Sequence, residues 1–536
     1  MDRRRRMYLV AAPAALLAGL PCILTMAAGP GDPIGMELPD PAVRGDSDAY
    51  QGVWHHWWVA TALGQGRDPR WCDAVFHPRG VTLVYDNIGW VDCLALSPVS
   101  AASPVVAYNI GLILNSVLVA AGVYALARSL GSGRAAALVS GILAAWMPVR
   151  LAHLLQHYQI AAAGWTALAL AAALRLSKGR GSGACRWALL ALLACLAMLE
   201  SPYHYLFLLV SAAALPLISE TARSGRAMAR VGTAVAAGGA PAAAFFLTGA
   251  SSALPPGLPA HRAVLWAGEP QALLLPSPFG LAGRLLGVPV RASWMPNAFE
   301  GILTPGLVVL ALALLWVIRT RRWRVAAAAA AMLVLALGPQ LKLLGRITPI
   351  PLPYRLIQML PLGGGFRSPA RFAVVGGMLL CVLAGRQLMR QRGWLRAALG
   401  LALALEVFPL RLPAVSGHIP DVYREYSGDG PVLEIPVDQD ARRTALFQTA
   451  DGRPRYASFL TRRPSWAADY VAGLDSAVSR ATSAGELMGA TGAGAVVYNR
   501  WLLPEPRVPR ADSTARRLFG QAPSDSLIYA TEGEAR

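Results

Sequence analysis

The sequence predicts an α-helical polytopic membrane protein with a small C-terminal α/β domain outside the membrane. Its 536 residues are 55% hydrophobic and only 15% charged, whereas soluble proteins carry about 25% charged residues. Many of the apolar residues form runs of roughly 17–25 residues, the length that crosses a bilayer as a helix. Arg and Lys gather in short clusters between these runs. The net charge of +19 therefore reflects cytoplasmic membrane loops, and nucleic acid is not expected as a partner.

About eleven membrane-spanning helices are expected in the first 411 residues. The apolar runs cover residues 7–28, 104–127, 134–150, 158–176, 186–200, 203–220, 230–248, 301–318, 325–341, 368–386 and 394–411. With a cytoplasmic N-terminus, every basic cluster between the runs lies on the cytoplasmic side, as the positive-inside rule requires. The first run has the basic start of a signal peptide, but its length favours retention as a membrane helix.

This orientation divides the chain into two domains. A transmembrane module comprises residues 1–411, and its long outer loops cover residues 29–103, 249–300 and 342–367. The tail, residues 412–536, lies outside the plasma membrane and contains GPVLEIPVD at 430–438, which predicts a buried strand. Helix-like and strand-like patterns alternate after it, which indicates a small α/β domain. Cys72 and Cys93 share the first outer loop, where they could form a disulfide or remain free thiols.

The stretch GDSDAYQGVWHHWW, residues 45–58, places two carboxylates at the start of the first outer loop. The pattern that follows predicts an amphipathic helix with Asp46 or Ser47 as its N-cap. We expect its aromatic face to lie at the membrane interface, where Trp rings settle. That face holds Trp54, Trp57 and Trp58. Asp46 could serve only as the cap, or Asp46 and Asp48 could face a binding site at the membrane surface.

Polar residues near the outer ends of other runs form a second group of candidates. His153 and His157 are four residues apart, with Gln159 nearby, so the two His share one helix face. Three roles are open for them: contact with an acceptor or a lipid head group, ordinary hydrogen bonding at a helix end, or binding of a divalent metal ion together with a nearby Asp. Glu200 and His204 occupy an outer tip between two runs, where ionisable residues often mark a functional pathway.

A pair of arginines lies on the outer side, against the positive-inside trend. Arg367 and Arg371 are four residues apart in GGGFRSPARF, beside a Gly-rich turn and the start of a helix. Such a pair suits an anion such as a phosphate, but it could also contact lipid head groups or pair with an outer-loop acid. A binding role and a structural role are both open for Glu300, Gln448, Asp451 and Arg455.

Several motifs together resemble a group of bacterial membrane proteins placed with the GT-C superfamily of membrane glycosyltransferases. The motifs are GDSDAYQGVWHHWW, FHPRGVTL, HLLQHYQIAAAGW, GGFRSPARF and LFQTADGRPRYASFLTRRP. The resemblance covers most of the chain and implies an enzyme that takes a sugar from a polyprenyl-phosphate carrier at the outer face. In inverting members, an acid of the first outer loop acts as general base. By position this is Asp46, supported by Asp48, although this chain has Asp-Ser-Asp where many members have an adjacent acidic pair.

We therefore expect a hexosyl- or pentosyltransferase that uses a polyprenyl-phosphate-sugar donor. The acceptor would be a glycan, lipid or protein of the cell envelope, and membrane lipids would surround the enzyme. Arg367 and Arg371 would hold the donor phosphate, which Arg suits because its planar fork pairs with phosphate oxygens. The remaining predicted substrate-binding residues are His153, His157, Gln159, Glu200 and His204. No cofactor is required by this scheme, since many superfamily members work without metal, and a divalent metal ion is the alternative.

Two other classes of protein remain possible from the sequence. A transporter or flippase of lipid-linked sugars would show inverted repeats and polar or broken helices near the midplane. Here the centres of the runs are almost purely Ala, Leu and Val, and the polar groups collect at the outer surface. A non-catalytic scaffold that binds a partner through its tail is the third possibility, in which case the acids of the first loop would be dispensable.

Overall fold

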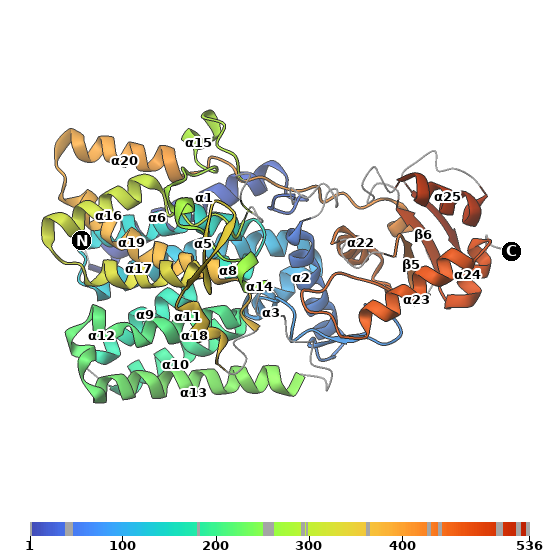
Figure 1. Ribbon diagram of the computed structural model, residues 1–536, viewed down its shortest axis with the longest axis horizontal. Coiled ribbons are helices and arrows are strands. Elements are labelled where there is room, and N and C mark those ends of the chain that lie inside the picture. The colour runs from blue at the N-terminus through green and yellow to red at the C-terminus, as the bar shows by residue number, and fades with distance from the viewer. Residues whose placement is uncertain are drawn as a thin grey trace.

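The protein consists of a helical bundle with a smaller domain beyond one end (Figure 1). The computed structural model describes residues 3–37, 47–179, 183–249, 262–290, 295, 299–360, 365–425, 430–437, 442–499, 508–520 and 527–531. The first outer loop, drawn in blue, lies between the bundle and the C-terminal domain, drawn in orange to red (Figure 1). The candidate residues described below meet at this junction.

Within the described ranges, five helical segments are long and apolar enough to cross a membrane. They are α5 (Pro104–Ser129), the segment Tyr158–Ser177 formed by α8 (Tyr158–Ala161) and α9 (Gly164–Ser177), α10 (Gly183–Glu200), α13 (Gly225–Gly249), and the segment Pro369–Arg390 formed by η4 (Pro369–Arg371) and α19 (Phe372–Arg390). A sixth is the bent pair α6 (Arg134–Trp146) and α7 (Pro148–Leu154). Shorter apolar helices are Ala12–Ala28 within α1 (Arg3–Ala28), α16 (Leu307–Thr320) and α17 (Arg324–Ala336). The chain is a helical membrane protein, and the count of eleven spans stays a prediction.

Some predicted runs form divided or shorter helices. The run 203–220 is split into α11 (Pro202–Ala213) and α12 (Leu215–Ile218). Pro216 lies in the first turn of α12, where its missing N–H and its ring prevent one continuous helix. The last predicted run forms α20 (Gly393–Val407), which has 15 residues. The helices in these two predicted runs are therefore too short to be identified as membrane spans by their length alone.

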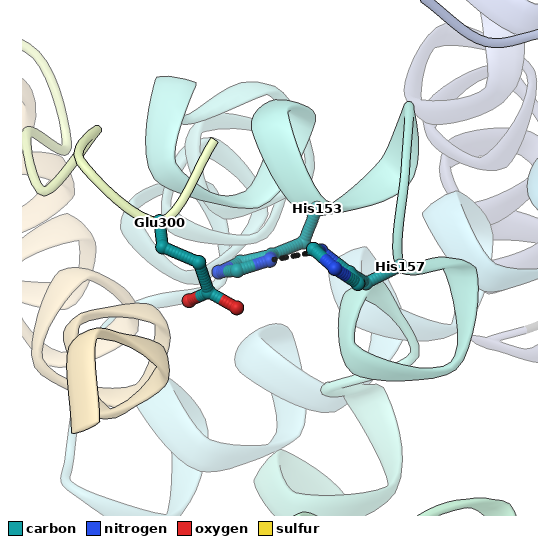
Figure 2. A group of neighbouring side chains, drawn as sticks. All are labelled: His153, His157 and Glu300. Carbon is teal, nitrogen blue, oxygen red and sulfur yellow. Dashed lines mark hydrogen bonds between the residues drawn. The ribbon is translucent and has the colours of Figure 1, made fainter. Parts of the chain in front are cut away.

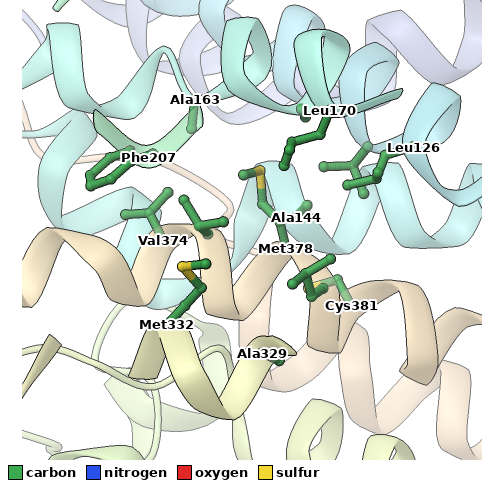
Figure 3. Packing of buried hydrophobic residues seen from close by; sticks show 14 of the residues in the cluster. Leu126, Ala144, Ala163, Leu170, Phe207, Ala329, Met332, Val374, Met378 and Cys381 are labelled. Carbon is green, nitrogen blue, oxygen red and sulfur yellow. The ribbon is translucent and has the colours of Figure 1, made fainter. Parts of the chain in front are cut away.

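The hydrophobic core of the bundle surrounds α19, almost all of whose residues are buried. Phe207 of α11 and Met332 of α17 pack near Val374 and Met378 of α19 (Figure 3). Small residues let the backbones approach closely, as is usual between helices in a membrane. A Cβ on Gly164 would lie 2.5 Å from the backbone carbon of Leu118, so glycine allows α9 to pack tightly on α5.

The bend between α6 and α7 places the next residues of the chain at the outer end of the bundle. The two helices meet at an angle of 48°, and Pro148 begins the second helix. The buried guanidinium of Arg150 donates to the carbonyls of Ala145, at 2.7 Å, and Ala161, at 3.0 Å. It thereby satisfies backbone acceptors that the break leaves without helical partners, as a helix inside a membrane requires. Arg150 thus fixes the α7–α8 connection, which carries His153 and His157.

The first outer loop begins with α2 (Asp48–Gly64), whose N-cap is Ser47, one of the two predicted caps. The prediction that its Trp face lies at the membrane interface was wrong. Trp54 and Trp58 are only 2% and 1% exposed, and the indole of Trp54 donates to Gln448 Oε1 at 2.8 Å. The C-terminal domain covers this face. The loop continues through β1 (Trp71–Cys72), antiparallel β2 (Val81–Thr82), α3 (Trp90–Ala95) and α4 (Ser97–Ala102). Cys72 and Cys93 are buried free thiols.

The C-terminal domain contains a three-stranded sheet in the order β5 (Val432–Ile435), β6 (Ala495–Asn499), β7 (Leu527–Thr531). Strands β5 and β6 are parallel, and β7 is antiparallel to β6. The strand expected within 430–438 is β5. The helices of this domain are α21 (Val422–Glu425), α22 (Arg443–Asp451), α23 (Ala467–Arg480), α24 (Ala484–Thr491) and α25 (Val508–Phe519). Of these, α22 packs against α2.

A buried polar network joins the C-terminal domain to the first outer loop. Arg455 is 2% exposed and pairs with Asp451 at 2.7 Å and with Glu434 at 3.4 Å. Its backbone N–H donates to the carbonyl of Ala74, and the amide of Gln448 donates to the same carbonyl at 2.6 Å. Of the two roles open for Gln448, Asp451 and Arg455, the structural one accounts for these contacts.

The outer segments that precede η4 brace the region around Arg367. Tyr354 donates to the carbonyl of Phe366 at 2.6 Å, and Glu269 accepts from the backbone N–H of Gly345 at 3.0 Å. The short elements of these segments are α14 (Arg262–Leu265), η2 (Pro270–Leu274), α15 (Leu281–Leu285), β3 (Gln340–Leu343), antiparallel β4 (Arg346–Pro351) and α18 (Tyr354–Gln358), while η1 (Glu220–Arg223) precedes α13. Arg367 therefore follows a braced stretch of chain.

Candidate functional site

Asp48 joins three separate parts of the chain at the end of the bundle that faces the C-terminal domain. It lies in the first turn of α2, and its side chain is 17% exposed. One carboxylate oxygen, Oδ1, is 2.6 Å from Nε of Arg442, which immediately precedes α22. The other, Oδ2, is 3.3 Å from Nε2 of His157, in the α7–α8 connection. A carboxylate of the first loop thus contacts both the membrane module and the C-terminal domain.

A compact group of His153, His157 and Glu300 adjoins Asp48 (Figure 2). The two imidazoles are hydrogen-bonded through their Nδ1 atoms at 3.4 Å. One potential ligand atom from each of the three residues lies within 4.8 Å of the others. Imidazole nitrogens and a carboxylate are donors that divalent metals accept, so this group could hold such an ion. Its carboxylate is Glu300, where the sequence suggested a nearby Asp.

Arg371 forms a buried ion pair with Glu300. Its Nε donates to Glu300 Oε1 at 2.9 Å, and its terminal NH2 group lies 2.8 Å from the same oxygen. Arg371 is 4% exposed, and its guanidinium carbon is 4.6 Å from the ring centre of Tyr203. Pairing with an outer-loop acid was one of the roles that the sequence left open for this arginine.

Arg367 has a different environment from Arg371. Its guanidinium carbon lies 6.0 Å from the ring centre of Trp266. Within the described ranges, no carboxylate lies at salt-bridge distance from it. The C-terminal domain brings Arg462 to the same place, where its terminal nitrogen donates to the carbonyl of Gly365 at 2.7 Å. Two arginines from different domains therefore adjoin one short segment.

Burial and the charges around Asp48 shift the pKa of its carboxyl group in opposite directions. Burial raises the pKa of Asp48, and the positive charges of Arg442, Arg371 and Arg367 offset only part of that rise. Burial also lowers the pKa of His157 well below its usual value, so this imidazole is neutral near pH 7. An acid with a raised pKa beside a neutral imidazole suits general acid–base chemistry.

Gln159 and His204 contact each other instead of Asp48. His204 Nε2 is 2.7 Å from the backbone carbonyl of Gln159, and its Nδ1 is 3.2 Å from the hydroxyl of Thr166. Both ring nitrogens are thus engaged in contacts between neighbouring helices. Asp46, the first-choice base of the sequence prediction, lies outside the described residues.

Glu200 is buried at the outer end of α10, where it meets Asp92 of the first outer loop. Its Oε2 accepts from the backbone N–H of Asp92 at 3.3 Å, and the carboxyl of Asp92 accepts from Asn115 at 2.7 Å. Burial raises the pKa of Asp92 to about 6. Glu200 is buried and Asp92 is half-buried, and two neighbouring carboxyl groups of this kind are most stable when they share a proton.

This carboxyl contact leads to a test of stability against pH. The folded protein holds a proton on Asp92 up to about pH 6, whereas the unfolded chain loses it near about pH 3.9. The contribution of Asp92 to the free energy of unfolding is therefore expected to fall as the pH rises through this window. Asp92→Asn should remove that fall. Thermal unfolding in detergent at pH 4.5 and pH 7 measures it, with exposed Asp421→Asn as control. Equal pH dependence in wild type and Asp92→Asn would contradict the prediction.

Sequence reasoning missed two further residues at this junction, Asp86 and Arg442. Asp86 accepts from His55 at 2.9 Å, from the Gln51 amide at 2.9 Å, and from the backbone N–H of Thr461 at 2.9 Å. Burial opposes its ionisation, but the hydrogen bonds from His55 and Thr461 bring the pKa of Asp86 below its usual value. Asp86 thus connects α2 to the C-terminal domain. The signal for Arg442 was available, since it is also an outer-face arginine.

Comparison of the fold with solved structures defines its class. The structure of the arabinofuranosyltransferase AftD from Mycobacteria matches with a TM-score of 0.55 and 15% identity, over 94% of this chain and 37% of that chain. Archaeoglobus fulgidus oligosaccharyltransferase AglB, in complex with an inhibitory peptide and a dolichol-phosphate, matches with a TM-score of 0.49 and 11% identity, over 99% and 75% of the two chains. The same enzyme tethered to an acceptor peptide gives 0.47 and 13%, over 97% and 74%.

The chain therefore shares its fold with AftD, which is a GT-C glycosyltransferase. The resemblance seen in the sequence motifs is thereby confirmed at the level of fold. The chain belongs to the family described as Domain of unknown function (DUF6311), whose model matches residues 42–410. No curated protein matches the sequence.

Proposed function

We propose that the chain is a membrane glycosyltransferase that works at the extracytoplasmic face. It would move a hexose or pentose from a polyprenyl-phosphate donor to a hydroxyl group of an envelope glycan, lipid or protein. The observation that carries this proposal is a series of side-chain contacts between the bundle and the C-terminal domain. Asp48 contacts Arg442 and His157, His157 lies in one group with Glu300, and Glu300 pairs with Arg371. One carboxylate and several guanidinium groups are what this transfer requires, and the GT-C fold adds support.

In the proposed reaction, Asp48 accepts the proton of the acceptor hydroxyl. The hydroxyl oxygen then forms a bond to the anomeric carbon of the donor sugar. The bond from that carbon to the phosphate oxygen breaks, and the phosphate leaves with the electron pair. Arginines stabilise the negative charge that develops on the phosphate. Asp46, two residues before Asp48, would support the base or share its role.

The neighbouring polar residues receive positioning roles in this proposal. His157 orients the carboxylate of Asp48, to which it is 3.3 Å distant, and His153 holds His157. Gln159 and His204 fix the helices behind the two imidazoles, while Glu200 anchors the first loop. A divalent ion at His153, His157 and Glu300 is the alternative to direct contact of these residues with the acceptor.

The proposed topology has eleven spans in the bacterial inner membrane. The N-terminus would be cytoplasmic, and residues 412–536 would form an extracytoplasmic α/β domain. This arrangement puts Asp48, Arg367 and the C-terminal domain on the same side, which agrees with the side-chain contacts between them.

A deletion strain tests the proposal against a transporter or a scaffold. Mass spectrometry of the envelope glycans should show the loss of one sugar, and wild type should restore it. The purified wild-type protein in detergent should then transfer that sugar from a polyprenyl-phosphate donor to glycan from the deletion strain. A flippase would transfer no sugar in this assay, because it only moves lipid-linked sugar across a sealed membrane and forms no glycosidic bond. Restoration in cells without transfer in detergent would favour transport, and an unchanged glycan profile on deletion would favour the scaffold.

A further inference from the structure

Arg462 contacts the backbone of the short segment that carries Arg367, although the two arginines belong to different domains. Arg367 follows the outer segments of the membrane module, and Arg462 belongs to the C-terminal domain. The guanidinium of Arg462 donates to the carbonyl of Gly365 at 2.7 Å, two residues before Arg367. The segment before Arg462 is held in turn by the hydrogen bond from the backbone N–H of Thr461 to Asp86. The position of Arg462 is therefore fixed by its own hydrogen bond to Gly365 and by the hydrogen bond of the preceding residue to Asp86.

These two guanidinium groups differ from those of Arg371 and Arg442, which are paired with carboxylates. Glu300 neutralises Arg371, and Asp48 neutralises Arg442. Neither Arg367 nor Arg462 has a carboxylate at salt-bridge distance within the described part of the chain. Both are half-buried. Burial lowers the pKa of each, and the charge of Arg371 lowers both further. Two partly desolvated like charges without counter-charges destabilise the protein unless an anion joins them.

We infer that Arg367 and Arg462 form one anion subsite for a phosphate monoester dianion, the head group of the spent lipid carrier. This assignment rests on the proposed function. The sugar-linked donor is a phosphodiester with one negative charge, and breaking the sugar–oxygen bond leaves a terminal phosphate with about two. The two positive charges of Arg367 and Arg462 therefore match the doubly charged phosphate of the product better than the singly charged phosphate of the donor. Arg462 would then stabilise the transition state more than the bound donor, which is the condition for accelerating the reaction.

The C-terminal domain thereby acquires a definite role. It is part of the donor site and supplies one of the two cations, so the membrane module alone has an incomplete site. Membrane phospholipids such as phosphatidylglycerol are phosphodiesters with a single charge. The subsite should therefore favour a prenyl phosphate over the lipids that surround the protein.

Ligand binding tests this inference without any transfer reaction. The purified full-length protein in detergent is titrated with geranyl phosphate, with inorganic phosphate and with short-chain phosphatidylglycerol, and Kd is measured by thermal shift or calorimetry. Wild type should bind geranyl phosphate more tightly than phosphatidylglycerol. Arg462→Gln and Arg367→Gln should each weaken geranyl phosphate binding by about tenfold or more, because each loses a charge-assisted hydrogen-bonding partner. Arg516→Gln removes an equal charge from an exposed site of the same domain and should bind as wild type does.

Arg462→Lys distinguishes loss of the site from loss of folding. It keeps the charge but not the planar fork, so binding should fall between wild type and Arg462→Gln. Wild-type affinity in Arg462→Gln would overturn the inference, as would equal weakening in Arg516→Gln. Binding of inorganic phosphate without binding of geranyl phosphate would assign the subsite to free phosphate instead. If geranyl phosphate binds as expected but no sugar is transferred, the proposed function fails while the anion subsite stands.

Discussion

Asp48→Asn is expected to reduce sugar transfer by about 10²–10⁴-fold while leaving the fold intact. Asn has nearly the same shape as Asp but cannot accept the acceptor's proton. The hydrogen bond from the backbone N–H of residue 48 to Gln156 Oε1, at 3.1 Å, does not depend on the carboxylate. Transfer by purified protein in detergent measures the effect. Asp46→Asn provides the matched comparison, because it removes the neighbouring acid of the same loop.

The pH dependence of transfer gives this prediction a second readout. The base is active only when it is deprotonated, and burial raises the pKa of Asp48. The rate in wild type is therefore expected to fall on the acid side, with a midpoint above the value of about 3.9 for an ordinary Asp. Asp48→Glu should keep measurable activity with a similar acid limb. Full activity in Asp48→Asn, or a larger loss in Asp46→Asn, would move the role of base away from Asp48.

Arg371→Gln is expected to lower the free energy of unfolding by about 3–5 kcal/mol, because it leaves the buried carboxylate of Glu300 without its counter-charge. The guanidinium contacts Glu300 through two nitrogens at 2.9 and 2.8 Å. Arg367→Gln leaves no carboxylate of the described ranges without a partner and removes one of two uncompensated like charges, so it should not lower the free energy of unfolding. Thermal unfolding of the two variants in the same detergent makes the comparison.

A double variant tests the cause of that destabilisation. Arg371→Gln combined with Glu300→Gln should recover much of the lost stability, because no buried charge then remains unpaired. If the double variant is as unstable as the sum of the two single variants, the ion pair is not the source of the effect. The contact of Arg371 with Tyr203 at 4.6 Å would then be the main contribution.

The sequence predicted the features that depend on local pattern. Apolar runs identified α5, α10, α13 and α19, because a helix in lipid needs about 20 apolar residues whatever surrounds it. The same reasoning singled out Arg367 and Arg371, and their location on the outer face stays a prediction. His153 and His157 were predicted to share one helix face, and this was wrong, because α7 ends at Leu154 and His157 precedes α8; their imidazoles are nevertheless in contact.

The features that depend on tertiary packing could not be predicted. A face with Trp54 and Trp58 is typical of a helix at the membrane interface. Here α22 packs against that face instead, which only the tertiary structure reveals. Arg442 and Asp48 are far apart in the sequence, so no spacing rule could pair them.

One group of α2 side chains belongs to the same hydrophobic core as β5, β6 and α23. Trp54, Trp58 and Val59 of α2 share this core with Leu433, Val496 and Leu474. A hinge between the membrane bundle and the C-terminal domain would have to split that core and expose large aromatic surfaces to water. Rigid-body opening between the bundle and the C-terminal domain would therefore carry a large free-energy cost. Grafting the domain onto another membrane module would require α2 to be transplanted with it.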